Sequence, residues 1–480
     1  MSAKLDHRAA SPATFKVFSV FWAFAALFHL LDATQFAGIF TNPKPSDIIQ
    51  AVVAGAALIL LTNPGYLGAF VVLAIATPIS AWIEAPDLGN HWLLESFVDL
   101  AFLIALLYAR RGWSINRERL GQVFFPFARF ILLAFYCFAA FSKLNSAFIN
   151  SSVSCANFFA AETFNSLGLP SQWLQGSGVL SSIFPYAVLA TECSIPILLM
   201  VRRTRNIGVA FAIAFHSFIA LDLSHPFSDF SMGLIPLFLL FLPADFWIKV
   251  QERVVHEIAW VRTLLSALMA GTALGLVFCL WDFNSFGQAV ILNGRLPYWI
   301  VVDTAILFLL GWYLLFKHDP PEPVLDLPDR AKWALVIPGL VVANGLTPYF
   351  EIKTAYSWNM YANLVTADGS TNHFLIPGTA HVTNFQDHLV KIVSSSDPNI
   401  QAYANGGYAI PVLQLREYLS THPQDSLTYS VDGVVSTFTP ASKDPTLVSD
   451  PPWWESRFFA FRALDENSPT RCQPSFLPLN

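Results

Sequence analysis

The feature that most constrains this chain is a series of apolar segments, each long enough to cross a lipid bilayer as a helix. A spanning helix needs about 20 mostly apolar residues. Only 12% of the 480 residues are charged, about half the share of an ordinary soluble protein. The sequence therefore predicts an all-α polytopic membrane bundle of about 9–11 transmembrane helices. The candidate spans are 15–38, 47–62, 66–83, 91–109, 124–142, 178–201, 206–223, 228–247, 261–281, 298–316 and 333–349, of which the second and last are the weakest.

Basic residues gather in three of the connecting loops, and this bias predicts the orientation. Loops rich in Lys and Arg stay on the cytoplasmic side. With an odd number of spans, the N-terminus is then cytoplasmic and the C-terminal tail lies outside the cytoplasm of a plasma or inner membrane. The apolar run from Phe15 is interpreted as a retained first span. The three basic loops contain Arg110, Arg111, Arg117 and Arg119, then Arg202, Arg203 and Arg205, then Lys249, Arg253 and Arg262.

Composition divides the chain into three parts. Residues 1–316 form the predicted bundle, and residues 317–349 contain a Pro-rich linker and a possible last membrane helix. Residues 350–480 have ordinary polarity, with strand-like stretches at 408–415 and at Tyr429–Phe438 broken by Pro, Asp and Ser. We expect a small β-rich extracytoplasmic domain or cap.

Several apolar segments carry ionisable residues, which lipid disfavours and which are candidates for function. The orientation places groups from four spans near the same outer side, so we expect them to lie at one depth. Glu192 lies in the middle of its span. The residues that share the outer level are His29, His91, Glu95, Lys143 and His216.

This set of residue types suits one kind of chemistry. A Lys in an apolar pocket loses its proton more easily, because desolvation disfavours the cation, and neutral Lys is a usable general base. A neutral His can donate a hydrogen bond to a developing oxyanion. Such a site fits an apolar substrate that arrives from the bilayer, such as a quinol.

Structural explanations exist for each of these residues. A membrane His often only bonds a neighbouring helix, which is an alternative for His29 and His225. Lys143 at the end of a span can extend to the headgroups. Glu192 can pair with a residue of a neighbouring helix, and Asp222 and Asp229 are expected to be solvated interface residues.

Four short motifs follow one another along the chain: Gly89-Asn90-His91, Ser142-Lys143-Leu144-Asn145, Phe215-His216-Ser217 and Phe230-Ser231-Met232-Gly233. In this order, these motifs resemble the vitamin K-dependent γ-glutamyl carboxylase superfamily, also called horizontally transferred transmembrane domain (HTTM) proteins, over residues 15–316. A further stretch, which includes 344–364 and ends at Asn372-His373, is similar to small bacterial members. It is expected to be either a cap that re-enters toward the bundle or a plain connector.

The resemblance implies a lyase-type carboxylase or an oxygenase that uses a reduced quinone like vitamin K hydroquinone. Lys143 would be the base that activates the hydroquinone, with His91 and His216 as further catalytic residues. Residues that would contact the cofactor are Asn90, Asn145, Glu95 and His29.

The chain also departs from the carboxylase pattern. Ser142 stands where the carboxylase has a second Lys, and the tail is smaller than the carboxylase's lumenal domain. Carboxylation of Glu-rich peptides is therefore not expected. A secreted peptide or protein remains one candidate substrate, and fold resemblance alone does not establish function.

The cysteines and the net charge narrow the remaining possibilities. Five Cys without a CxxC motif argue against a zinc site, and we expect no metal. Cys155 and Cys472 both fall on the predicted outer side, where a disulfide is permitted. A net charge of −6 gives no indication of nucleic-acid binding.

Two non-enzymatic functions remain as alternatives. The first is a transporter or export factor in which the same groups line a path, and the second is a maturation partner for a secreted peptide. Transporters often contain internal repeats, and no repeat is visible here. Polar groups gathered at one level favour an enzyme or a binding pocket.

Overall fold

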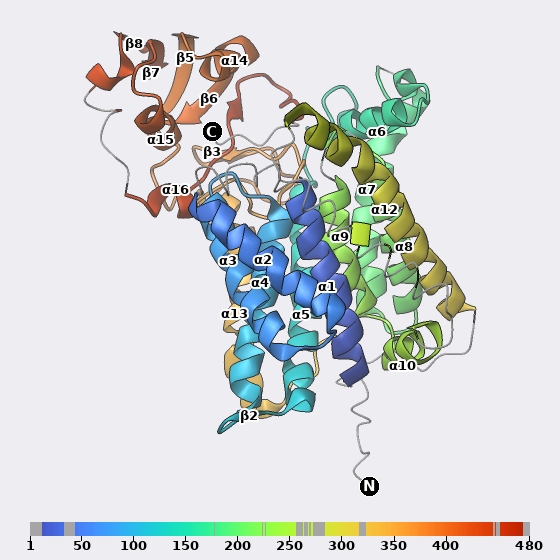
Figure 1. Cartoon of the computed structure of the whole chain (residues 1–480). Helices are drawn as coiled ribbons and strands as arrows, with labels where there is room; N and C mark the ends of the chain where they lie inside the picture. The colour runs from blue at the N-terminus through green and yellow to red at the C-terminus, as the bar shows by residue number, and fades with distance from the viewer. Residues whose placement is uncertain are drawn as a thin grey trace.

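A computed structural model describes residues 12–32, 44–176, 178–222, 224–225, 227–255, 284–315, 323–444 and 452–473, with the isolated positions 263, 267, 270, 271 and 447. The helices pack into one bundle, and a small mixed domain sits on the end opposite the N-terminus (Figure 1). The bundle helices are α1 (Pro12–Asp32), α2 (Pro45–Thr62), α3 (Leu67–Glu84), α4 (Asn90–Ala109), α5 (Arg117–Ser142), α6 (Cys155–Ser166), α7 (Val179–Met200), α8 (Arg205–Ile219), α9 (Phe227–Leu239), α10 (Ala244–Lys249), α12 (Asn284–Leu314) and α13 (Val336–Leu346).

The apolar segments form the expected kind of helix. Among the described residues, eight helices are long and apolar enough to cross a membrane, or nine if one bent pair counts as a single span. Helices of this length and composition are typical of a multi-pass membrane protein, and they confirm the predicted helical bundle. The weak second segment is the regular helix α2, and the weak last one joins a 3₁₀ turn (Asp329–Leu335) to α13.

Three predicted spans differ from what the structure shows or lie beyond it. The span expected at 228–247 is broken, because α9 and α10 meet at 109° where Pro243 caps α10 and cannot continue the preceding helix. The span expected at 206–223 is the 15-residue helix α8, shorter than a bilayer requires. The span expected at 261–281 falls almost entirely outside the described residues.

Aromatic side chains fill the centre of the bundle. Phe18 of α1 packs against Phe70 of α3 and Phe124 of α5, with ring centroids 6.4 and 5.4 Å away. Phe102 of α4 lies 4.3 Å from Phe70. Offset and edge-on aromatic pairs of this kind are favourable beyond their buried area. Their packing fixes how α1, α3, α4 and α5 face one another, and with them the ends of these helices.

The predicted small β-region is an antiparallel sheet of five strands in the order β8-β7-β5-β6-β9. Asp432 and Gly433, both with positive φ, form the two-residue turn of the β7–β8 hairpin within the predicted 429–438 stretch. The stretch 408–415 is a strand only in its first half, because α15 begins at Val412. The elements of this domain are β5 (Leu389–Ser395), α14 (Pro398–Gly406), β6 (Tyr408–Pro411), α15 (Val412–Thr421), β7 (Leu427–Val431), β8 (Val434–Phe438), α16 (Glu455–Phe458) and β9 (Leu464–Asp465).

Residues 351–388, which we call the cap segment, return from α13 to the bundle. The segment contains the short strands β3 (Thr366–Ala367) and β4 (Ser370–Thr371). Trp358 is fully buried, and its indole N–H donates to the Val341 carbonyl at 2.8 Å. His373 forms a β-bridge with Asn145. The re-entrant cap, one of the two expected alternatives, is therefore what the chain forms.

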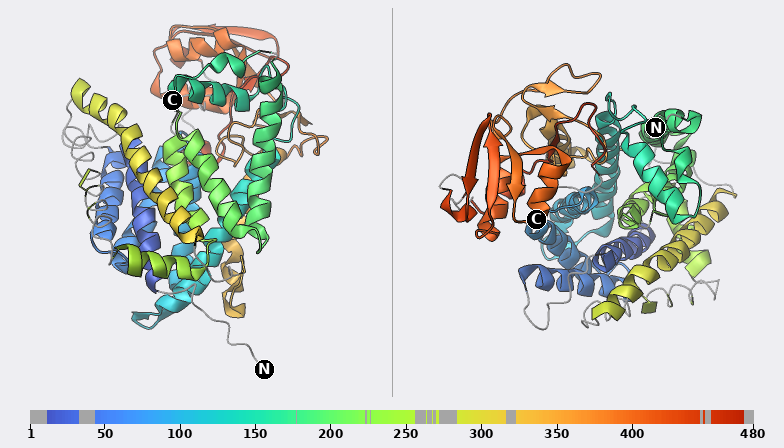
Figure 2. Two further views of the ribbon diagram at one scale, coloured as in Figure 1. Left: turned by 90° about the vertical axis from the view of Figure 1, so that its right-hand side faces the viewer. Right: turned by 90° about the horizontal axis from the view of Figure 1, so that it is seen from above.

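A disulfide joins Cys155 at the start of α6 to Cys472 near the end of the described chain. The pairing that the sequence left open is present in the structure. It connects two regions that lie at the same end of the molecule, where the C-terminal domain covers one side and α6 the other (Figure 2). The basic hairpin of β1 (Arg110–Arg111) and β2 (Ser114–Ile115) lies at the opposite end (Figure 1).

Candidate functional site

Residues of α5, α6, α7, α8 and α9 and of the cap segment line a cavity of about 110 Å³, which we call the Lys143 cavity. Its wall is almost entirely aromatic and aliphatic. Tyr136, Lys143, Glu192 and His216 add polar groups to that wall. A concave apolar site with a few convergent polar groups is typical of small-molecule binding.

Lys143 is turned into the bundle and does not extend to the headgroups. It follows the last residue of α5, and 6% of its surface is exposed. Its Nζ lies 2.7 Å from Glu192 Oε2 and donates to the Ala139 carbonyl at 3.2 Å. Glu192, on α7, is thus the helix-neighbour partner that the sequence offered as one alternative. Lys143 is thus paired with a half-buried carboxylate, as a buried charge requires.

His216 is held by hydrogen bonds on both ring nitrogens. The Ser231 hydroxyl donates to the His216 carbonyl, so its oxygen accepts from Nδ1–H at 3.2 Å. Nε2 is then the acceptor for the Tyr136 hydroxyl. This pattern of partners is the one made by an imidazole that carries its proton on Nδ1. With a partner on each ring nitrogen, His216 orients Tyr136.

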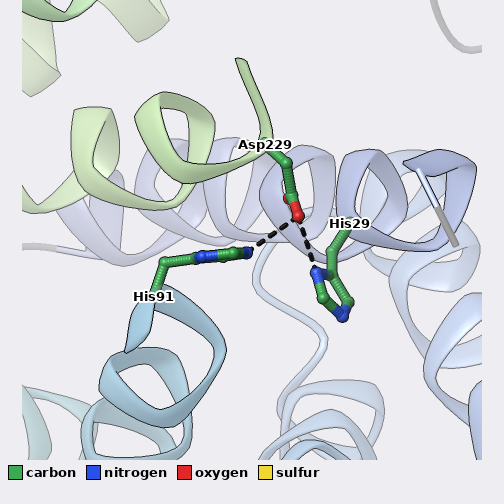
Figure 3. Close-up of side chains that lie close together, drawn as sticks. All are labelled: His29, His91 and Asp229. Atoms are coloured by element: carbon green, nitrogen blue, oxygen red, sulfur yellow. Dashed lines mark hydrogen bonds and ion pairs between the residues drawn. The ribbon is translucent and has the colours of Figure 1, made fainter. Parts of the chain in front are cut away.

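A second polar centre lies beside the Lys143 cavity, where three helix ends meet. The carboxylate of Asp229, at the start of α9, lies between two imidazoles (Figure 3). Its Oδ2 is 2.8 Å from His29 Nδ1 and 2.8 Å from His91 Nε2. Asp229 is 3% exposed. The expectation of a solvated Asp229 was wrong, because the ends of α1 and α4 cover it. Asp222 is also buried, at 2% exposed, and pairs with His225.

Phe230 lies between the two centres. Its ring centroid is 6.0 Å from that of His91 and 5.2 Å from that of His216. The structure therefore brings Lys143 and His216 to one cavity and places His91 in the neighbouring centre with His29. The expected residues therefore gather at one end of the bundle in two neighbouring groups, because the helix face that each side chain occupies decides which group it joins.

Glu95 lies one turn after His91 on the same helix and is 2% exposed. It interacts electrostatically with Asp229 and His29, which places it beside the second centre. Gly233 makes room for it, since a Cβ there would come within 2.2 Å of Glu95 Oε1. That oxygen has no hydrogen-bond partner among the described residues.

Asn90 and Asn145, expected to contact a cofactor, hold the cap segment. The Asn90 side-chain oxygen accepts from the Trp358 backbone N–H at 3.0 Å. Asn145 Nδ2 donates to the Ala362 carbonyl at 2.6 Å. The cap in turn places Met360 and Tyr361 in the wall of the Lys143 cavity. Burial raises the pKa of Tyr361, so its hydroxyl stays protonated.

The cap segment has an unusual backbone that serves this placement. Tyr356, Trp358, Tyr361 and Asn363 have φ between 34° and 60°, a region that costs about 1–3 kcal/mol for a residue with a side chain. Such conformations persist only where the surroundings fix them. Here, the buried Trp358 and the hydrogen bond from the Cys155 N–H to Asn363 Oδ1, at 2.9 Å, hold the segment.

The site predicted from the sequence left out three residues of the two centres. Tyr136 gave no signal because its neighbours are all apolar. Asp229 adjoins the Phe230-Ser231-Met232-Gly233 motif, which could have drawn attention to it. Glu192 was recognised only as a buried charge without a named partner. Comparisons with protein-family models, with curated proteins and with solved structures found no match, so the resemblance to the carboxylase superfamily rests on its motifs alone.

Proposed function

We propose that this chain is a membrane enzyme that binds a lipid-soluble hydroquinone in the Lys143 cavity and removes a proton from it. In this proposal the basic end that carries β1 and β2 faces the cytoplasm and the C-terminal domain lies outside. The observation that carries the proposal is the Lys143–Glu192 ion pair, 2.7 Å long, inside an apolar cavity that also contains His216.

The ion pair supplies both a proton acceptor and a cation. A proton that moves from the Lys143 ammonium to the Glu192 carboxylate leaves a neutral amine at Nζ. That amine accepts the proton of a substrate hydroxyl. The products are a Lys143 ammonium, a protonated Glu192 and a quinolate, and the ammonium then stabilises the new oxyanion. Proton number and charge balance within the site.

The surroundings of α7 suit a substrate that arrives from the bilayer. Phe184, Val188 and Glu192 recur every four residues and line the cavity, so one face of α7 forms its wall. Only 22% of α7 is buried, the lowest share of the eight spanning helices. The face of α7 opposite the cavity is therefore exposed at the surface of the bundle, while Met360 and Tyr361 line the cavity on the side of the cap.

The resemblance to the carboxylase superfamily provides the reaction class of this proposal, in which oxygenation of the activated hydroquinone drives carboxylation or another oxygen-dependent step. The second substrate is left open. The Lys143 cavity accounts for the hydroquinone step alone.

Purified protein in lipid nanodiscs, supplied with vitamin K hydroquinone and oxygen, tests the proposal. We expect oxygen uptake with oxidised quinone products, followed by chromatography. Lys143→Met and Glu192→Gln should each lower the rate by about 100-fold or more, as loss of a general base does. Lys249→Met, which removes a Lys paired with Asp245 at 2.7 Å in α10, is the matched control and should not change the rate. Full activity in Lys143→Arg would show that Lys143 is not the base.

One observation favours transport as a second candidate. Broken helices are common in secondary transporters, where the break lies at the substrate site, and α9 and α10 meet at 109°. Here α10 lies toward the end that carries the N-terminus, opposite the C-terminal domain (Figure 1), and none of its residues lines the Lys143 cavity. Transport predicts that quinone-free liposomes containing the protein take up protons or solute through a path that Lys143→Met blocks.

A further inference from the structure

The centre formed by His29, His91 and Asp229 has no part in the proton transfer at Lys143. Its three candidate ligand atoms, one from each residue, all lie within 4.8 Å of one another. They come from the end of α1, the first turn of α4 and the first turn of α9. We propose that these three side chains bind one divalent transition-metal ion of the zinc or ferrous-iron class.

The donor set fits this class of ion. Imidazole nitrogen suits zinc and iron, and two His with one carboxylate leave coordination positions open for water or a ligand. Ligand atoms bound at about 2.1 Å in a tetrahedral site are separated by about 3.4 Å. The two separations from Asp229 Oδ2 are hydrogen-bond lengths of 2.8 Å, and the two imidazole nitrogens lie within 4.8 Å of each other, so small side-chain shifts would bring all three atoms to one ion.

A second shell orients His29, as is usual for a metal-bound imidazole. With Nδ1 facing Asp229, Nε2 faces the Glu84 carboxylate at 3.8 Å. Glu84 is itself held by the Ser80 hydroxyl at 2.6 Å and by the Gln50 amide at 3.4 Å. The His29 ring also stacks on Trp92, with centroids 3.8 Å apart. These contacts hold the plane of the His29 ring before any ion arrives.

Charge supplies an independent argument. Glu84, Glu95 and Asp229 lie around the two imidazoles, and the last two are at most 3% exposed. Glu95 Oε1 has no hydrogen-bond partner within the described part of the chain. Buried carboxylates are costly unless paired or bound to a metal. A doubly charged cation would stabilise the ionised carboxylates of this group, which Glu95 adjoins through its electrostatic interactions with Asp229 and His29.

Metal content measured on the purified full chain tests the proposal, with a tag that contains no His. After growth with zinc and iron, or after dialysis against Co²⁺, we expect about one ion per chain. Bound Co²⁺ should show visible absorption that reports nitrogen and oxygen ligands. His29→Gln, His91→Gln and Asp229→Asn should each lower the content at least tenfold. His225→Gln, which removes an imidazole paired with Asp222 at 3.1 Å, is the matched control and should bind normally.

Two milder variants keep the test valid if a ligand variant does not fold. Glu84→Gln should weaken Co²⁺ binding about 10–100-fold through the orientation of His29. Gly233→Ala should displace Glu95 and also weaken binding. The proposal is overturned if the wild-type chain binds less than about 0.1 Co²⁺ per molecule, because the three residues would then form a hydrogen-bonded triad without a metal. It is also overturned if the variants of His29, His91 and Asp229 keep the full metal content. Hydroquinone turnover does not enter this measurement, so the two proposals fail separately.

Discussion

Lys143 and Asp229 show how two opposite buried charges are accommodated at one end of the bundle. Lys143 pairs with a carboxylate 49 positions later in the chain, and Asp229 accepts from imidazoles on two other helices. The sequence predicted that Lys143, His91 and His216 matter, because lipid disfavours such residues. It could not predict their partners, since contacts between helices depend on packing.

Lys353, three residues after the last apolar span, is a third buried ionisable residue, and it packs over an aromatic ring. It is 8% exposed and lies over the Tyr356 ring, with Nζ 4.1 Å from the ring centroid. Burial lowers the pKa of Lys353 from 10.5 to about 7. In the unfolded chain the group keeps its ordinary value.

The predicted consequence is a stability that depends on pH. Between pH 7 and 10.5 the unfolded chain holds a proton that the folded chain has lost, so stability rises with pH through this window. Below pH 7 both states are protonated and the full cost of burying the cation remains. We expect Lys353→Met to raise the melting temperature at pH 6 and to have a progressively smaller effect toward pH 9. A difference from the wild type that is the same at every pH would contradict this expectation.

Helix α13 shows how an element is positioned by a single small residue. Gly345 faces α5, and a Cβ at this position would come within 2.4 Å of the Phe138 ring. Asn344 Nδ2 donates to the Tyr356 carbonyl at 3.0 Å, so the same turn of α13 also holds the cap segment. Close approach of α13 to α5 therefore fixes where the cap begins.

Two glycines of α13 give a matched prediction. Gly345→Ala should destabilise the protein by about 1–3 kcal/mol, because the added methyl group meets a packed ring. Gly339→Ala on the exposed side of the same helix meets nothing within 4 Å and should stabilise it by up to about 1 kcal/mol, through the better helix propensity of Ala. Thermal unfolding in one detergent compares the two. Equal effects would show that α13 does not pack closely on α5.

Helix α4 shows what a sequence pattern can and cannot predict. His91, Glu95 and Asp99 recur every four residues, which places them on one face of a helix. The helix forms as expected. Its polar face meets α1 and α9, with Asp99 Oδ1 accepting from the Trp22 indole at 2.9 Å, so His91 faces away from the Lys143 cavity. The sequence pattern predicts which residues share a face of α4, and the packing of the bundle decides which helices that face contacts.

At the scale of the whole molecule, the disulfide and the cap segment connect the C-terminal part to the bundle. The Cys155–Cys472 bond spans 317 positions in the chain. Near it, the Cys472 N–H donates to the Val153 carbonyl at 3.0 Å, and Asn363 Nδ2 donates to the same carbonyl at 3.0 Å. Since Cys155 and the cap residues Met360 and Tyr361 all line the Lys143 cavity, the connection also shapes the site.

Loss of this disulfide has a predicted effect on the whole molecule. A bond that closes a long loop stabilises by about 2–4 kcal/mol. We expect Cys155→Ser with Cys472→Ser to lower the melting temperature and to make the C-terminal domain more sensitive to protease. Dithiothreitol should reproduce the shift in the wild type and add nothing in the double variant. Cys137→Ser, at an exposed free thiol, is the control, and an unchanged melting temperature in the double variant would contradict the prediction.

The sequence by itself determined the class of this protein. Length, apolarity and the spacing of charges predict a helical membrane bundle with a small sheet-containing domain at its C-terminal end, because the free energy of placing a segment in lipid is a sum over its own residues. The same local reasoning identified Lys143, His91 and His216 as residues that need an explanation. It also predicted that Cys155 and Cys472 lie on the same, outer side of the membrane.

Only the tertiary structure decided how these residues group. It paired Lys143 with Glu192, put His91 with His29 and Asp229 behind Phe230, broke the span at Pro243 and returned the cap segment over the cavity. The physical reason is that each of these outcomes depends on which faces of distant helices meet. Packing of side chains such as Phe18, Phe70 and Phe124 fixes those faces, and no local pattern encodes it.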